Sequence, residues 1–177
     1  MLLTAFLQFG AAIPLGIFTA TAVNRLHFLG VEAAGPSIAL FGGFAAAFNM
    51  FMSSSVSWTA THRGIADDVL LTHGLYRMHT AFAGPGLAVP LGLLVAGLAI
   101  PAGVEALLPR WFVVAGLAVA VCGELSWLGL ISAKALFLVP LTASLGFAWL
   151  IAAGFALPDT VVYVRPAAER IVRPKVA

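Results

Sequence analysis

The sequence predicts an all-α integral membrane protein, a bundle of about five transmembrane helices. Hydrophobic residues make up 62% of the 177 residues and charged residues only 9%, whereas a soluble domain usually carries about 25% charged residues. Except for Glu124, every charged side chain falls between or after long apolar runs. Runs of roughly 20 such residues match the hydrocarbon thickness of a bilayer. They are continuously apolar rather than alternating, which indicates helices and not strands.

Five spans follow one another along the chain. They cover residues 2–23, 35–61, 79–100, 111–131 and 135–157. The first two close at the polar pairs Asn24-Arg25 and His62-Arg63, and the last closes at Pro158-Asp159. Residues 1–158 therefore form one helical transmembrane domain, and residues 159–177 form a polar tail.

The connection between the second and third spans is long and polar. Within it Ile65, Val69, Thr72 and Tyr76 recur at helical spacing, which predicts a short helix lying on the membrane surface. The third span contains Gly84-Pro85-Gly86 and then Pro90. Each proline removes a backbone hydrogen bond, so we expect this helix to bend or break.

The basic residues predict an orientation. Three of them fall on one side (Arg63, Arg77 and Lys134), and six fall on the other (Arg25, Arg110, Arg165, Arg170, Arg173 and Lys175). The positive-inside rule then places the tail in the cytoplasm. The expected partners are the lipid bilayer and either further copies of this chain or other membrane proteins. A net charge of +2 does not imply nucleic-acid binding. The single cysteine, Cys122, excludes an internal disulfide and a Cys-x-x-Cys pair.

Glu124 is the first candidate for a functional role, because an ionisable group at bilayer depth is costly. On a helix its face includes Gly116, Ala120, Trp127 and Leu128. It could serve proton-coupled movement or bind a cationic ligand. The alternative is a carboxyl that burial keeps neutral and that bonds to a neighbouring helix for packing.

The second span carries a polar face. Asn49, Ser53 and Ser57 recur at four-residue intervals, after the small residues Gly42 and Ala46. This face could line a polar cavity, or it could bond across helices, with Glu124 as one conceivable partner. Small and hydroxyl residues are also the ordinary material of helix contacts in lipid, and this packing role is the one we favour.

Three histidines are candidates for a metal or haem site. His62 ends the second span, His73 lies in the connection and His79 opens the third span. Two of these imidazoles could face each other across a hairpin, although the spacing matches no established site. We predict neither a cofactor nor a set of catalytic residues. The chain has no phosphate-binding Gly-rich loop with Lys, no His-Glu-x-x-His and no Gly-x-Ser-x-Gly.

Several segments resemble an uncharacterised family of bacterial multi-pass membrane proteins, a domain of unknown function (DUF4386-like). The more specific segments are Leu108-Pro-Arg-Trp111 and Gly123-Glu-Leu-Ser126. The others include Ile13-Pro-Leu-Gly-Ile17, Asn24-Arg-Leu-His-Phe-Leu-Gly30, Val89-Pro-Leu-Gly-Leu-Leu94 and the run from Gly146 to Pro158. The resemblance implies a helical bundle in the bacterial inner membrane and supplies no activity. It also implies a further helix before the first span.

Three functional interpretations remain open. The first is a non-enzymatic membrane protein with a structural, interaction or sensory role. The second is a small transporter-like or proton-linked protein that uses Glu124 and the face from Asn49 to Ser57. The third is a haem- or metal-binding membrane protein.

Overall fold

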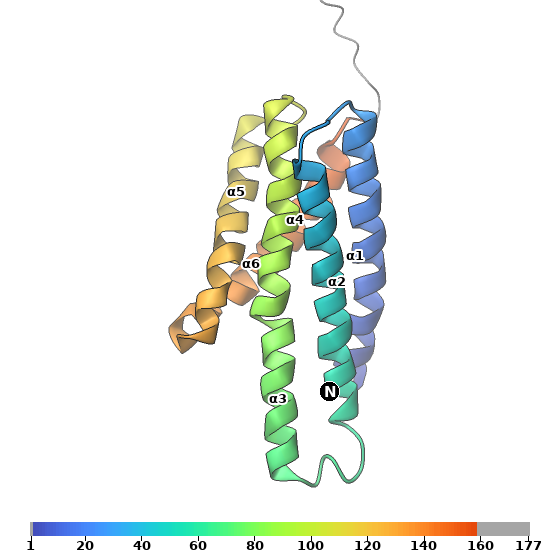
Figure 1. Cartoon of the computed structure of the whole chain (residues 1–177), viewed down its shortest axis with the longest axis vertical. Coiled ribbons are helices and arrows are strands. Elements are labelled where there is room, and N and C mark those ends of the chain that lie inside the picture. Colours follow the sequence, from blue (N-terminus) through green and yellow to red (C-terminus); the bar gives the residue numbers. More distant parts are fainter. Residues whose placement is uncertain (1, 159–177) are drawn as a thin grey trace, which may run out of the picture.

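The chain folds into a bundle of long helices (Figure 1). A computed structural model describes residues 2–158, and within them it contains helices and loops but no strand. The helices are α1 (Leu2–Phe28), α2 (Gly35–Thr59), α3 (Val69–Ala83), α4 (Pro85–Val104), α5 (Arg110–Leu125), the 3-10 helices η1 (Ser126–Leu130) and η2 (Ala133–Phe137), and α6 (Leu138–Ala156). The predicted tail, residues 159–177, lies outside the described residues.

Five helical segments are long and apolar enough to cross a membrane. They are Leu2–Phe28, Gly35–Thr59, Val69–Val104, Arg110–Leu130 and Ala133–Ala156. The predicted all-α class with five membrane-crossing helices is thus confirmed. The spans differ from the sequence prediction mainly at their ends, which apolar composition defines less sharply than the middle of a run.

The third segment differs most, because α3 and α4 follow each other along one direction (Figure 1). Together they span 36 residues, which at about 1.5 Å per residue is about 54 Å, well beyond the ~30 Å of a bilayer core. The helix predicted between the second and third spans exists as α3. It does not turn aside from the bundle, as a helix lying on the membrane surface would. Instead it continues the line of α4 and packs beside α2.

The predicted break of the third span is present at Gly84. This residue both ends α3 and precedes α4, and its ψ of −112° interrupts the helical geometry. Pro85 then occupies the start of α4, where a missing N–H costs no helical bond. Pro90 and Pro101 lie inside α4, which continues through both of them.

The helices pack with α4 at the centre. It contacts α2, α5, α6 and α3, and Leu91, Leu94, Val95 and Leu98 on it are at most 2% exposed. In Figure 1, α1, α2, α4 and α5 stand side by side, and α6 crosses behind them. Asn49 of α2 and the carboxyl-terminal half of α5 both contact this central helix.

The outer surface is strongly apolar. Large side chains such as Phe6 (74% exposed), Phe41 (67%) and Phe155 (89%) point away from the bundle. Water would disfavour such a surface and lipid tails would not. A strongly apolar outer surface is the one expected of a multi-pass membrane protein.

Candidate functional site

Four polar side chains meet between α1, α2 and α3, and we call them the polar cluster: Gln8, Ser53, Ser57 and His79. Gln8 Nε2 donates a hydrogen bond to Ser53 Oγ at 2.6 Å. His79 Nδ1 lies 2.8 Å from Ser57 Oγ and 3.1 Å from the Ser53 carbonyl oxygen. The cluster thus connects α2 to α1 on one side and to α3 on the other.

The surroundings of His79 favour one tautomer. A backbone carbonyl oxygen can only accept a hydrogen bond, whereas a serine hydroxyl can donate or accept. Since His79 Nδ1 is close to the Ser53 carbonyl, we assign the proton of the neutral ring to Nδ1. In this arrangement Nδ1–H donates to α2, and the imidazole holds the carboxyl-terminal part of α3 against that helix.

Asn49 lies one turn before Ser53 on α2 and faces α4 instead. Its Nδ2 donates to the carbonyl oxygen of Ala45 at 2.8 Å. A Cβ added to Gly86 of α4 would stand only 2.7 Å from Asn49 Oδ1. The predicted polar face of the second span therefore lies in contacts between helices, with Asn49 against α4 and the two serines toward α1 and α3.

Glu124 lies apart from the polar cluster, one residue before the end of α5. Here α4 and α5 approach closely, because a Cβ added to Gly92 would stand 2.9 Å from the Ala120 carbonyl oxygen and 3.2 Å from Gly123 Cα. The Glu124 backbone nitrogen is 3.4 Å from that same point. Glu124 Oε1 is buried and has no hydrogen-bond partner among the described residues.

The central helix α4 separates the two sites. Gly86 of α4 meets Asn49 of α2, whereas a Cβ added to Gly123 of α5 would stand 2.8 Å from the Ala88 carbonyl oxygen of α4. Positions 86 and 88 are two residues apart, and residues two apart on an α-helix are rotated by about 200°. The contacts with α2 and α5 therefore lie on different sides of α4. The serines of the second span, considered as partners for Glu124 from the sequence, bond to α1 and α3 instead.

The helical face predicted for Glu124 is interrupted. Gly116 and Ala120 precede it on α5, as expected, but Trp127 and Leu128 belong to the 3-10 helix η1. A 3-10 helix has three residues per turn rather than 3.6, so the side chains after Glu124 change direction. The apolar run in the sequence continues across this boundary and does not reveal it.

The three candidate histidines occupy different surroundings. His62 Nδ1 is 3.1 Å from the Trp58 carbonyl oxygen, and its ring packs edge-on against the Trp58 indole. His73 is exposed on α3 and His79 belongs to the polar cluster. The described residues contain no group of three or more His, Cys, Asp or Glu side chains placed to hold a metal ion. A haem held by two of these imidazoles stays an alternative and not a prediction.

Comparisons with known proteins assign no role to these residues. No protein-family model, curated protein or solved structure matches this chain. Function is therefore inferred from the geometry and the sequence.

Arg25 has a role that the sequence did not suggest. Its guanidinium donates to three backbone carbonyl oxygens at the end of α6, those of Pro158 (3.1 Å), Gly154 (3.4 Å) and Leu157 (2.6 Å). The last carbonyls of a helix lack helical partners, and a cation there also interacts favourably with the helix dipole. The signal in the sequence was a basic residue at the end of the first span. Its carbonyl partners lie 129 to 133 positions further along the chain.

Gln8 was also missed as a member of the polar cluster. Its amide is the sole side-chain amide in the first apolar run, residues 2–23, and in lipid such a group requires a partner. That isolation was a usable signal. The choice of Ser53 as its partner depends on how α1 and α2 pack, which the sequence does not specify.

Proposed function

We propose that this chain is a multi-pass integral membrane protein without enzymatic activity, with a structural, interaction or sensory role in the bacterial inner membrane. The polar cluster is the observation that carries this proposal. Gln8 Nε2 and His79 Nδ1 bond to α2 from two different helices. Polar groups used in this way stabilise helix packing in lipid, whereas a transport path or catalytic site would direct them toward a ligand.

The proposal includes an orientation with the carboxyl terminus in the cytoplasm. It is supported by the six Lys and Arg residues on the side of the tail against three on the other. A single cysteine introduced at Ser132, in a Cys122→Ser background, should react with an impermeant maleimide added outside intact cells. One introduced at Glu32 should not react. The reverse pattern would reject this orientation.

A proton-linked role for Glu124 is the second candidate function. It is favoured by one observation, namely that Glu124 Oε1 is buried without a hydrogen-bond partner among residues 2–158. An intramembrane carboxyl of this kind can take up and release a proton or hold a cation. The helix contact at Gly92 and Gly123 would fix its position.

One experiment distinguishes the two functions. The purified protein is reconstituted into vesicles that contain a pH-sensitive dye, and a proton gradient is imposed. We expect proton flux equal to that of vesicles without protein. Flux that depends on the protein and that Glu124→Gln abolishes, with an unchanged thermal unfolding midpoint, would replace the first function with the second.

A further inference from the structure

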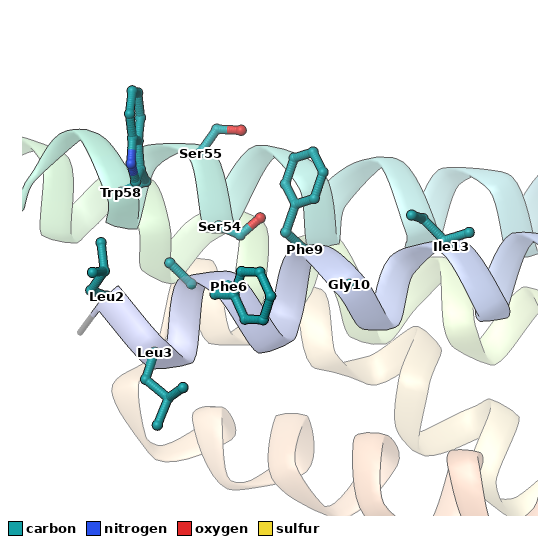
Figure 2. A pocket seen from close by; sticks show the side chains of 10 residues that line it. Leu2, Leu3, Phe6, Phe9, Gly10, Ile13, Ser54, Ser55 and Trp58 are labelled. Atoms are coloured by element: carbon teal, nitrogen blue, oxygen red, sulfur yellow. The ribbon is translucent and has the colours of Figure 1, made fainter.

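A groove runs along the outer face of the bundle between α1 and α2 (Figure 2). Its volume is about 730 Å³, and its lining includes Leu2, Phe6, Phe9, Gly10, Ile13 and Trp58. Phe6 and Trp58 are both more than half exposed, so they form rims, whereas a Cβ added to Gly10 would meet nothing within 4 Å. The groove thus has bulky walls and open space above Gly10.

The chemistry of the groove selects an apolar occupant. Its described lining contains no charged side chain, and apart from the Trp58 indole its polar side chains are Ser54 and Ser55. The hydroxyl of Ser54 donates to the Met50 carbonyl oxygen at 2.9 Å, and that of Ser55 donates to the Phe51 carbonyl oxygen at 2.8 Å. With these hydroxyl protons already used within α2, the walls offer mainly carbon contacts to a ligand.

The length of the groove distinguishes a lipid chain from a helix. On α1 it extends from Leu2 to Ile13, which corresponds to about 17 Å at 1.5 Å per residue. That is close to half of the ~30 Å hydrocarbon core, the depth of one leaflet. Beyond Ile13, the Phe44 ring lies 3.9 Å from the position of a Cβ on Gly16. A docked transmembrane helix would need the full thickness, whereas an acyl chain needs one leaflet.

The end of the groove at Trp58 carries an aromatic residue, and one basic side chain follows it in the connection to α3. Trp58 lies there, in the last turn of α2, as an interfacial aromatic residue would. The ring of His62 packs on it with centroids 4.3 Å apart, and the exposed Arg63 follows. In the same connection, Asp68 Oδ1 accepts a bond from the Leu71 N–H at the start of α3, and Asp67 is exposed. A phosphate at this end would complement Arg63.

We propose that the groove between α1 and α2 is a phospholipid site that takes one acyl chain of the leaflet on the side of α3. In this site the methyl end of the acyl chain lies near Gly10 and Ile13, and the phosphate of the lipid lies near His62 and Arg63. This site is independent of the proposed function, because it uses neither the polar cluster nor Glu124.

Two photoreactive phospholipids test the site. The protein is reconstituted in phosphatidylethanolamine and phosphatidylglycerol vesicles that contain a trace of a phospholipid with a diazirine either at the acyl-chain terminus or next to the ester. After irradiation and digestion, we expect the terminal probe to label the peptide around Gly10 and Ile13. The ester-proximal probe should label the peptide around Trp58. Equal labelling of the outer faces of α5 and α6 would overturn the proposal.

A matched pair of glycine substitutions provides the control. Gly10→Phe places a ring in the groove and should lower labelling of α1 and α2 several-fold, with α5 and α6 unchanged. Gly74→Phe on α3 should leave all labelling unchanged, since a Cβ there also meets nothing within 4 Å. If Gly10→Phe keeps both the wild-type labelling and the wild-type thermal midpoint, no acyl chain occupies the groove.

A second copy of this chain is the competing occupant. Oxidation of Gly10→Cys in a Cys122→Ser background would then yield disulfide-linked dimers in the same vesicles, and that result would also overturn the proposal. Monomers together with the depth-ordered labelling would support the lipid site.

Discussion

The polar cluster and Glu124 are both polar sites inside an apolar bundle, but their atoms are satisfied differently. In the cluster, Gln8 bonds to Ser53 at 2.6 Å and His79 lies 2.8 Å from Ser57. At the other site, Glu124 Oε1 is buried without a partner among the described residues. Unpaired polar groups are costly in lipid, so the hydrogen-bonded cluster is typical of helix packing. Glu124 is typical of a side chain whose partner lies outside the described residues. A polar side chain within a span is therefore a candidate for function only once its hydrogen bonds to the rest of the bundle are known.

The largest effect should follow from disturbing the helix contact beside Glu124. Gly92→Leu would place a Cβ 2.9 Å from the Ala120 carbonyl oxygen of α5, and overpacking of this kind costs about 3 kcal/mol. We expect a marked fall in the thermal unfolding midpoint in detergent. Gly74→Leu on α3 is the control and should change little. A Gly92→Leu protein as stable as wild type would contradict the close approach of α4 and α5.

A smaller loss is expected from His79→Phe in the polar cluster. The substitution leaves the Ser57 hydroxyl and the Ser53 carbonyl without their ring partner, and a lost buried hydrogen bond costs about 1–3 kcal/mol. Reversible unfolding in mixed micelles measures this free energy. His73→Phe is the matched control, because His73 is exposed on the same helix. Equal stabilities for the two variants would remove His79 from the cluster.

The bond between α1 and α2 should show a still smaller coupling. In a double-mutant cycle of Gln8→Leu and Ser53→Ala, we expect a coupling free energy of about 0.6 kcal/mol, typical of hydrogen bonds between membrane helices. The same cycle with Ser55→Ala should give zero, since the Ser55 hydroxyl bonds within α2. Equal coupling in both cycles would rule out a specific Gln8–Ser53 bond.

The smallest stability effect is expected at Glu124 itself. Glu124→Leu removes a carboxyl with one unpartnered oxygen, so little hydrogen-bond energy is lost and the free energy of unfolding should stay equal or rise slightly. Glu105→Leu, at an exposed position, is the reference. A loss as large as that of His79→Phe would show that Glu124 is hydrogen-bonded in the folded protein and would erase the contrast between the two sites.

The helices were predictable because their signal is local. A run of apolar residues defines a span, and the Gly84-Pro85-Gly86 segment identified the break before α4. The direction of α3 was not predictable, since helical spacing of Val69, Thr72 and Tyr76 indicates a helix but not its orientation. Its continuation along α4 coincides with contacts that His79 makes with α2.

The candidate site was predictable only in part, for the same reason. Asn49, Ser53 and Ser57 could be placed on one face from their spacing. Their partners could not be identified, because Gln8 and His79 lie 45 and 22 positions away from the serines they contact. The isolation of Glu124 likewise depends on α4, which lies between α5 and α2.

The three bonds of Arg25 bear on the order in which the molecule is assembled. Arg25 lies in the last turn of α1, and its carbonyl partners are Gly154 in the last turn of α6 and the two residues that follow this helix, Leu157 and Pro158. These bonds can form only after all five segments have entered the membrane. They join α1 directly to the end of α6, so that two helices far apart in the sequence hold each other through one side chain.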